Sequence, residues 1–389
     1  MKVLQASKAY FPHIGGVETV ARQLAEGFVA EGWRSEVLVA AEGRGSTVEE
    51  IGGVTVRRAS TLARALSLPL CPGYPRALRR AEADVLVVHE PSLLPSSVLW
   101  ADRRSWRRRF DRIVVWWHSD IVRQSAFVPF FRPVLEHLLD IADVVVAATP
   151  HHVSVSPYLQ RVRDKVAIVP YGVEWSRFRD GPARPDLVEA HRRRAGGRAL
   201  VSFAGRLVGY KGIAELIAAF ERVPDAHLVV AGDGPDRVLV SESRLYREGR
   251  VSLLGRVSQD ELDALYWASD AFVLPSVLRS EMFGLVQLDA MACATPVVTF
   301  DLPTGVTWVN RHEQTGLVAP LGSVSGLAAA INRLVAEPDL AARLGQNARC
   351  RVERCFDVTT MLRKTAGLCR GDDIGELAAV RAGDVGRGA

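Results

Sequence analysis

Short apolar runs alternate with helical patterns along almost the whole chain. In the first half, runs such as KVLQAS (residues 2–7), DVLVVHE (84–90) and RIVVWWHS (112–119) are bounded by turn residues. Runs that are apolar at consecutive positions predict strands buried on both faces, as in parallel sheets covered by helices. The second half repeats the plan from ALVSFAG (199–205) to TPVVTFD (295–301). The pattern therefore predicts an α/β protein with two doubly wound, Rossmann-like parallel sheets.

The chain is too long for one typical domain. Its 389 residues favour two domains, and residues 173–197 are rich in Gly, Pro and Arg, which is typical of a linker. We therefore expect an N-terminal domain over residues 1–172 and a C-terminal domain over residues 198–355. A helix near residues 356–370 is expected to pack back on the N-terminal domain, and the Gly-rich residues 371–389 are expected to form a flexible tail.

Two cations follow the first strand of the second half. Arg206 and Lys211 lie among glycines, in the segment GRLVGYKG (205–212). Fixed cations at a strand end can stabilise the charge of a nucleotide diphosphate leaving group, which is the role of a metal elsewhere. The sequence has no Asp-x-Asp motif and no His/Cys ligand cluster, so we expect neither a metal nor a cofactor. The alternative interpretation is a pair of surface cations on a loop.

The stretch SEMFGLVQLDAMACA (residues 280–294) places two acids around a predicted helix start. Glu281 precedes Phe283-Gly284-Leu285, and Asp289 follows inside an apolar run. A helix that begins near Gly284 has free amides in its first turn, which can hold a phosphate or sugar oxygen. Asp289 would lie about 7.5 Å further along the helix axis. The two acids are thus placed to hold two hydroxyl-bearing parts of one anionic ligand, such as a nucleotide diphosphate sugar.

Candidate site residues also follow strands of the first half. Gly15-Gly16 precede a predicted helix and allow the backbone to approach a phosphate or an acceptor, although such a pair is also common in ordinary turns. His118 ends the run RIVVWWHS and is either a site residue or a structural histidine. Because ligands of doubly wound sheets bind at the carboxyl ends of the strands, candidates in both halves predict a cleft between two domains.

Composition limits the setting of the protein. Five cysteines without a CxxC pair favour a reduced, cytoplasmic environment. The N-terminus shows no signal-peptide pattern. The sequence contains no run of 18 apolar residues, so it predicts no membrane-spanning helix. We expect a cytoplasmic protein that can be peripheral on the inner face of the membrane.

Arginines are concentrated in a few segments of this chain of net charge +5. The segment ADRRSWRRRFDR (residues 101–112) carries six of them. It predicts either a solvated helix face or a patch that docks on anionic lipid, with Trp106 and Phe110 at the interface. No helix-turn-helix, zinc-finger or RNP-like signature accompanies the arginines, so we expect no nucleic acid partner.

Five further motifs occur in order with the Glu281 stretch. They are YFPHIGGVE (residues 10–18), FAGRLVGYKG (203–212), VVAGDGP (229–235), LLGRVSQDELDALYWASDAFVLPS (253–276) and TGLVAP (315–320). Together they resemble the retaining glycosyltransferases of family 4 (glycosyl transferases group 1, GT-B fold) over roughly residues 1–365. DLPTGVTWVN (301–310) is similar to the subgroup that assembles O-antigen and exopolysaccharide.

The resemblance implies a role for each matching residue. Arg206 and Lys211 would bind the diphosphate, Glu281 the sugar hydroxyls, and the amides of Phe283 to Leu285 would complete that pocket. His118 would lie beside the donor sugar, and Gly15-Gly16 near the β-phosphate and the acceptor. Val257, in the segment GRV, would belong to the backbone that contacts the nucleobase.

One position departs from the family pattern, which has Glu, seven residues and a second Glu. Asp289 stands at the second acid and would meet the ribose hydroxyls. Because Asp is one methylene shorter, either the helix sits closer or a water bridges the gap.

The resemblance further implies hexosyl transfer, with retention of configuration, to a hydroxyl of a glycan or lipid-linked acceptor in polysaccharide or lipopolysaccharide biosynthesis. GDP-mannose is the leading donor, followed by UDP-sugars. A two-domain NAD-dependent dehydrogenase is one alternative, but the loop after the first strand lacks G-x-G-x-x-G. A non-enzymatic basic scaffold that binds membrane or nucleic acid is another, and it would not need Arg206, Lys211 and Glu281 together.

Overall fold

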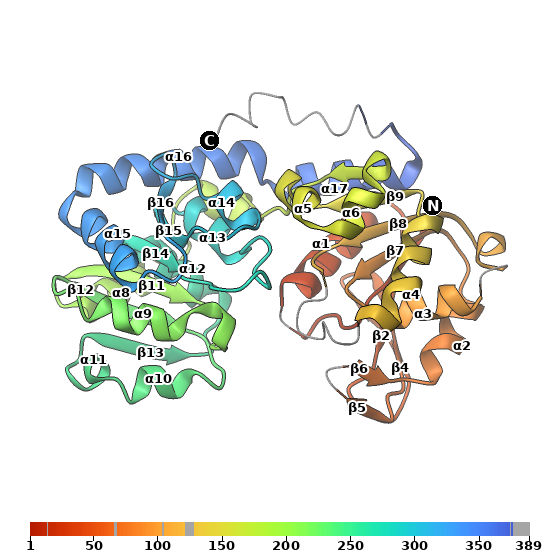
Figure 1. Cartoon of the computed structure of the whole chain (residues 1–389), viewed down its shortest axis with the longest axis horizontal. Helices are drawn as coiled ribbons and strands as arrows, with labels where there is room; N and C mark the ends of the chain where they lie inside the picture. Colours follow the sequence, from red (N-terminus) through yellow and green to blue (C-terminus); the bar gives the residue numbers. More distant parts are fainter. Residues whose placement is uncertain (14, 66–67, 103–104, 121–127, 374, 376–389) are drawn as a thin grey trace. The chain divides into compact units, whose positions relative to one another are not determined.

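Two parallel sheets, each with its own core, organise the chain. The computed structural model describes residues 1–13, 15–65, 68–102, 105–120, 128–373 and 375. The chain divides into unit 1, Met1–Tyr171 with Thr359–Ala389, and unit 2, Gly172–Val358 (Figure 1). The chain thus leaves unit 1 after Tyr171 and returns to it at Thr359.

The described part of unit 1 contains an eight-stranded sheet in the order β10-β9-β8-β7-β1-β2-β4-β3, in which only β3 is antiparallel to its neighbour. Its strands are β1 (Lys2–Ala6), β2 (Arg34–Ala40), β3 (Thr47–Ile51), β4 (Val54–Ala59), β7 (Ala83–Glu90), β8 (Phe110–Trp117), β9 (Val144–Ala147) and β10 (Val166–Ile168), with a separate hairpin of β5 (Ala63–Ala65) and β6 (Leu68–Leu70). Its helices are α1 (Gly16–Ala30), α2 (Gly73–Arg80), α3 (Leu93–Ala101), α4 (Val128–Ile141), α5 (Pro150–Val155), α6 (Pro157–Arg161) and α17 (Val358–Arg370).

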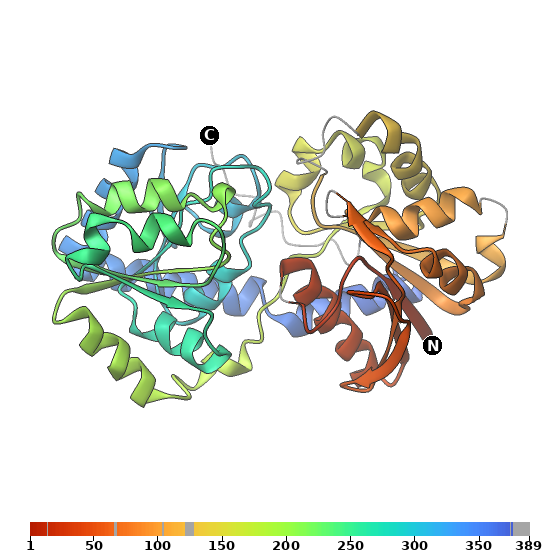
Figure 2. The same ribbon diagram turned by 90° about the horizontal axis from the view of Figure 1, so that it is seen from below.

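Alternate residues of the unit 1 strands pack on different helices. Leu4 and Leu86 lie in a core with side chains of α2, α3 and α4, whereas Val37 and Val39 pack on α1. On the α1 side, α17 lies against α1 (Figure 2), because Gly27 leaves room for the side chain of Leu362. Arg112 of β8 donates a hydrogen bond to Leu368 O near the end of α17, at 2.7 Å.

The described part of unit 2 contains a six-stranded parallel sheet in the order β13-β12-β11-β14-β15-β16. Its strands are β11 (Ala199–Ala204), β12 (Ala226–Ala231), β13 (Val251–Gly255), β14 (Ala271–Leu274), β15 (Val297–Phe300) and β16 (Gly316–Ala319). Its helices are α7 (Ser176–Arg179), α8 (Pro185–Ala195), α9 (Ile213–Phe220), α10 (Arg237–Ser241), α11 (Arg244–Arg247), α12 (Gln259–Ala268), α13 (Val286–Ala292), α14 (Gly305–Val309), α15 (Val324–Ala336) and α16 (Pro338–Cys355).

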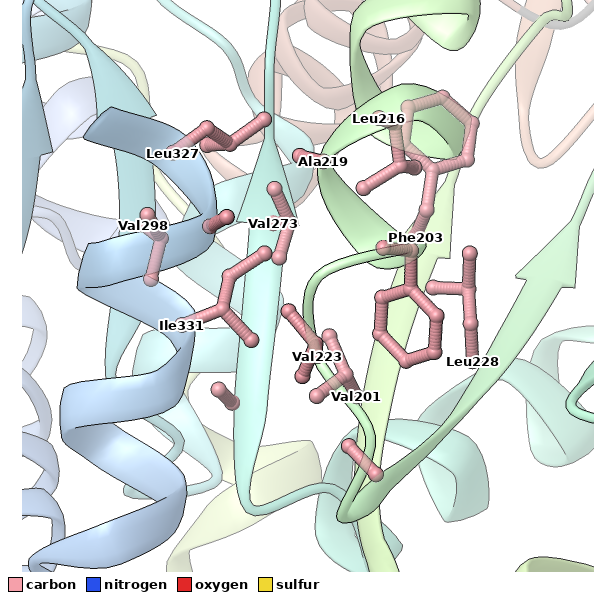
Figure 3. Close-up of a cluster of buried hydrophobic side chains, with 14 of the residues drawn as sticks. Val201, Phe203, Leu216, Ala219, Val223, Leu228, Val273, Val298, Leu327 and Ile331 are labelled. Carbon is pink, nitrogen blue, oxygen red and sulfur yellow. The ribbon is translucent and has the colours of Figure 1, made fainter. Parts of the chain in front are cut away.

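The core of unit 2 lies between its sheet and helices α9 and α15. Figure 3 shows Val201 and Phe203 of β11 among side chains of these helices, including Leu216 and Ile331. These side chains are at most 1% exposed. The apolar face of the strand and the apolar faces of the two helices therefore pack together and exclude water.

Each sheet has a point at which the strand order reverses. In unit 1 the chain runs from β1 outwards to β2 and returns on the other side of β1 as β7. In unit 2 it runs from β11 to β12 and β13 and returns as β14 beside β11. The crevice at the carboxyl ends of such strand pairs is the general ligand position of open α/β sheets.

Residues 173–197, which the sequence suggested as a linker, contain α7 and α8 and belong to unit 2. Arg177 binds Asp263 of α12 at 2.5 Å, and Arg192 binds Asp270 at 2.8 Å. The buried residues of α8 are His191 and Ala195. Neither is a large apolar residue, so the sequence did not show the helical spacing of apolar side chains that would have predicted α8.

Candidate functional site

The loops after β11 and β12 cross backbone to backbone in unit 2. Gly232 has φ +136°, and a Cβ at this position would overlap the carbonyl oxygen of Gly205. Gly212 has φ +69°, and a Cβ there would overlap the carbonyl oxygen of Pro275, which follows β14. Glycine is therefore required at both positions, and it brings the loops after β11, β12 and β14 into direct contact.

A buried ion pair joins the two sides of the strand reversal in unit 2. Lys211, from the loop after β11, binds Glu281, from the loop after β14. Their side chains are 10% and 11% exposed, and Ser276 Oγ donates a further hydrogen bond to Glu281 Oε2 at 3.0 Å. The structure thus brings together two predicted site residues that are 70 positions apart.

Arg206 lies in the same loop as Lys211, but it is exposed, whereas Lys211 is buried. Its side chain is exposed and makes no hydrogen bond or ion pair with another described residue. An unpaired guanidinium beside a glycine-lined loop is available for a phosphate group.

The helix after Glu281 begins later than the sequence predicted. α13 starts at Val286, because Gly284 has φ +71° and forms a turn instead of the first helical residue. The side chain of Phe283 is 3% exposed and packs edge-on against Phe356, so only its backbone can contribute to a site. The amides of Gly284 and Leu285 donate to no other described residue.

Asp289 is a half-buried carboxylate without a hydrogen-bond partner among the described residues. Burial raises its pKa to about 7, although Arg177 lowers it, and the like charge of Asp263 raises it further. The structure shows no contact between Asp289 and the pair of Lys211 and Glu281. Such a carboxylate is free to accept hydrogen bonds from a ligand.

Val257 lies beyond the end of β13 and is half-buried. It precedes Ser258, whose side chain caps α12 by accepting from the Glu261 amide at 3.2 Å. Val257 follows the carboxyl end of β13, and Lys211 follows the carboxyl end of β11. Because β12 lies between these two strands, the two residues lie at the same end of the sheet but do not touch.

Gly15 and Gly16 lie at the start of α1, after the first strand of unit 1. Gly15 is the extended residue before the helix, and its carbonyl accepts the Thr19 amide at 2.9 Å. A Cβ at Gly15 would overlap the Glu18 carboxylate, so this side chain takes the space that a larger residue would occupy.

His118 is part of a buried series of hydrogen bonds in unit 1, which we call the His118 chain (Gln5, His89, His118 and Tyr171). Gln5 Oε1 and His89 Nε2 are 2.6 Å apart, and His89 Nδ1 and His118 Nε2 are 2.9 Å apart. His118 Nδ1 lies 2.6 Å from Tyr171 Oη. Both ring nitrogens of His118 are therefore occupied by protein partners.

Burial keeps both histidines of this chain neutral. It lowers the pKa of His89 to about 3 and the pKa of His118 well below its usual value, and His89 and His152 lower the latter further. Sequence reasoning missed Gln5, His89 and Tyr171. The available signal was a polar residue inside an apolar strand run, at Gln5 in KVLQAS and at His89 in DVLVVHE.

Glu90, the neighbour of His89, was also missed. It is fully buried and accepts hydrogen bonds from Ser96 Oγ and, at 2.7 Å, from the Ser92 amide. Burial raises its pKa to about 8, so it is a neutral structural acid over most of the physiological range.

Trp106 and Phe110 of the arginine-rich segment 101–112 do not lie at the surface, as the lipid-facing patch suggested by the sequence would need. Trp106 is 7% and Phe110 0% exposed, and both belong to the core, so neither can lie at a lipid interface. Arg107 binds Asp143 at 2.6 Å, and Arg109 binds Asp102 at 2.7 Å. Arg103 and Arg104, which were part of the same prediction, lie outside the described residues, as does nearly all of the expected tail 371–389.

Within the described ranges, no three or more His, Cys, Asp or Glu side chains are grouped so that they could hold a metal ion. The helices in the same ranges include none that combines the length and apolar character of a membrane span.

Comparison with known proteins gives consistent matches along the chain. Residues 188–351 match the family described as "Glycosyl transferases group 1", and residues 15–172 match the "Glycosyl transferase 4-like domain". D-rhamnosyltransferase WbpZ of Pseudomonas aeruginosa is 31% identical over 362 residues, which cover 92% of each protein. O-antigen chain mannosyltransferase C of Escherichia coli is 29% identical over 372 residues, 93% of this chain and 96% of the relative.

Similarity extends to solved structures. Anabaena HepE in complex with UDP-glucose superposes with a TM-score of 0.75 at 20% identity, covering 95% of this chain and 99% of HepE. At this identity the likeness concerns the fold.

Proposed function

Since the chain belongs to the group 1 glycosyltransferases and has the GT-B fold, we propose that it moves a hexosyl group from a nucleoside diphosphate sugar to a hydroxyl of a glycan or lipid-linked acceptor. The observation that carries this proposal is the pair of Lys211 and Glu281 at the strand reversal of unit 2, with Arg206 unpaired in the same loop. Family membership decides against the dehydrogenase and scaffold alternatives.

The donor would bind on the loops of unit 2. Arg206 and Lys211 would hold the diphosphate, and Glu281 would accept hydrogen bonds from sugar hydroxyls while it keeps Lys211 in place. The unpaired carboxylate of Asp289 suits two ribose hydroxyls, and the free amides of Gly284 and Leu285 suit a sugar or phosphate oxygen. Val257 would lie near the nucleobase.

The residues of unit 1 would contact the acceptor and also the phosphate and sugar of the donor. The start of α1 at Gly15-Gly16 suits a phosphate or acceptor oxygen, because α1 has 15 residues and Gly15 provides no side-chain cap for the amides of its first turn. His118 would lie beside the donor sugar as a neutral residue.

Bond breaking would place one additional negative charge on the β-phosphate. Two fixed cations, Arg206 and Lys211, would stabilise this charge without a divalent ion. The acceptor oxygen would form the new bond to the anomeric carbon, and its proton would pass to the departing phosphate oxygen on the same face. This route retains the anomeric configuration.

The state of Glu281 supports such a front-face route over a double displacement. A carboxylate nucleophile must be free to attack the anomeric carbon. Lys211 and Ser276 both donate to Oε2 of Glu281, so one oxygen of this carboxylate is engaged by the protein.

Mannose from GDP-mannose is our leading donor, because a mannosyltransferase and a rhamnosyltransferase of similar length are among the relatives. A UDP-sugar is the second choice, because HepE, which has a similar fold, binds UDP-glucose. An acceptor from polysaccharide or O-antigen assembly agrees with the name of one relative, O-antigen chain mannosyltransferase C.

The proposal is tested with purified protein, a panel of nucleotide sugars and a lipid-linked oligosaccharide extract. Arg206→Ala and Lys211→Ala should each reduce turnover by about 10²-fold, which is the usual loss for one preorganised charge at a reacting group. Arg247→Ala is the matched control, because Arg247 is an exposed arginine of unit 2 on α11. Near-normal turnover in both site variants would refute the assignment.

We also propose that unit 1 contacts anionic membrane, through α2 instead of segment 101–112. Arg76, Arg79 and Arg80 of α2 are exposed and form no ion pair with another described residue. Beside them lies a pocket of about 280 Å³ with a mainly apolar lining from α2, α3 and Pro69. Leu70, the last residue of the β5–β6 hairpin that also contains Pro69, is 62% exposed. Unpaired arginines next to exposed apolar side chains suit a phosphate head group and the start of its hydrocarbon chain.

A further inference from the structure

The His118 chain spans three neighbouring strands of unit 1. Gln5 of β1 pairs in register with Val87 of β7, and His89 of β7 pairs with Trp116 of β8. Because side chains alternate along a strand, Gln5, His89 and His118 all project from the same face of the sheet. Their exposed fractions are 0%, 1% and 6%, so these groups depend on each other for hydrogen bonds.

Tyr171 binds His118 on the side opposite His89. It is 5% exposed and is the last residue of unit 1 before the chain enters unit 2. The ring of Trp116 lies 5.7 Å from the rings of both His118 and Tyr171, with interplanar angles of 20° and 18°. The His118 ring is therefore held by hydrogen bonds at both nitrogens and by an indole at its face.

The proton positions follow from the orientation of the Gln5 amide. A neutral imidazole has one donor and one acceptor nitrogen. With the carbonyl oxygen of Gln5 facing His89, His89 must carry its proton on Nε2 and accept on Nδ1. His118 must then donate from Nε2 to His89 and accept the Tyr171 hydroxyl proton at Nδ1.

We propose that Gln5, His89 and Tyr171 are positioning residues that hold His118 in one orientation and in the neutral Nε2–H tautomer during transfer. This rests on the proposed function, in which His118 lies beside the donor sugar. In this state His118 neither gives nor takes a proton in the reaction, which leaves the proton transfer to the departing phosphate.

The surroundings agree with a neutral ring. Among the described residues, the titratable groups that act on or bind His118 are His89 on β7, His152 on α5 and Tyr171, and no carboxylate is one of them. Asp120 acts on His152, and it accepts hydrogen bonds from Trp117 and Ser156 at 2.7 Å each. Burial lowers the pKa of His152 to about 4, so the neighbouring histidine is also neutral at pH 7.

The test compares three variants of the full chain. His89→Leu removes both hydrogen bonds of His89 and leaves His118 Nε2–H without an acceptor, and Tyr171→Phe removes only the hydroxyl. Each should lower kcat/KM for the nucleotide sugar by about tenfold or more, because Tyr171→Phe leaves one buried polar group unpaired and His89→Leu leaves two, Gln5 Oε1 and His118 Nε2–H. His89→Gln is the conservative control, because its oxygen can accept from His118 and its amide can donate to Gln5. It should stay within about threefold of the wild type.

Three further measurements distinguish positioning from a general structural role. Histidine ¹⁵N spectra of the wild type should show His89 and His118 as neutral Nε2–H tautomers from pH 8 down to pH 6. The wild-type pH profile of kcat should show no histidine titration in this range, whereas Tyr171→Phe should introduce one. Binding of a nucleoside diphosphate without the sugar should be unchanged in all variants, because its contacts lie in unit 2.

A protonated or Nδ1–H form of His118 at pH 7 would overturn the inference, as would wild-type kcat/KM in His89→Leu. If no nucleotide sugar supports transfer by the wild type, the proposed function fails. The tautomer spectra would then still decide the arrangement of the His118 chain.

Discussion

Removing one partner of the buried pair of Lys211 and Glu281 should destabilise unit 2 as well as reduce turnover. In Lys211→Met the side chain is one atom shorter and loses its charge, and Glu281 retains the Ser276 hydroxyl as a partner. Loss of one partner from a buried ion pair typically costs 3–5 kcal/mol. Because both side chains are about a tenth exposed, we expect the lower end, about 3 kcal/mol. For a unit of this size that is a fall of about 9 °C in Tm.

The double variant separates the structural contribution from the catalytic one. Lys211→Met with Glu281→Gln leaves no unpaired charge in the pocket, so it should be more stable than Lys211→Met by about 2 kcal/mol. Turnover should stay lost in both, since the diphosphate cation is absent.

The assay is scanning calorimetry of the wild type, both single variants and the double variant. The transition of unit 2 is identified as the one that a nucleoside diphosphate raises in the wild type. If the double variant lost as much stability as Lys211→Met, or as much as the two single variants together, the two charges would not stabilise each other. Wild-type turnover in Lys211→Met would refute its role at the leaving group.

Three further outcomes are expected. Activity should survive excess EDTA, measured as sugar transfer with and without added magnesium; a loss that magnesium restores would show that Arg206 and Lys211 do not replace a metal. Because the pKa of Asp289 is raised to about 7, its carboxylate is mostly protonated at pH 6 and ionised at pH 8, so the Kd of a nucleoside diphosphate should fall about tenfold over that range; Asp289→Asn should show a flat profile, and a flat wild-type profile would contradict the ribose contact. Replacing Arg76, Arg79 and Arg80 with Ser should release the protein from vesicles of anionic lipid, whereas the same change at Arg163, Arg193 and Arg247 should not; equal binding to neutral vesicles would exclude the α2 surface.

The two sheets and the edge that carries the site were predictable because both depend on local patterns. Continuous apolar runs mark buried parallel strands, and ligands bind at their carboxyl ends in any doubly wound sheet. Arg206, Lys211 and Glu281 could thus be placed at one sheet edge from strand ends alone. Their pairing could not, since contact between loops 70 residues apart depends on glycines that let backbones cross.

Other errors arose where a residue type was given more weight than its position. Trp106 and Phe110 lie in an arginine-rich segment, yet Phe110 is the first residue of β8 and faces the core. The positive φ of Gly284 delays α13, which no periodicity shows. The partners of His118 come from β1, β7 and Tyr171, and only the strand order brings them together.

The double passage of the chain between the two units has a consequence for biosynthesis. Residues 1–171 leave the ribosome first, but α17, which packs on α1 at Gly27 and is held by Arg112, follows only after all of unit 2. Unit 2 is continuous in sequence and can fold as soon as it emerges, whereas the nascent unit 1 waits with the α1 surface uncovered. Translation that stops before residue 359 would therefore yield a folded unit 2 attached to an incomplete unit 1 with an exposed apolar face, which is a substrate for chaperones and proteases.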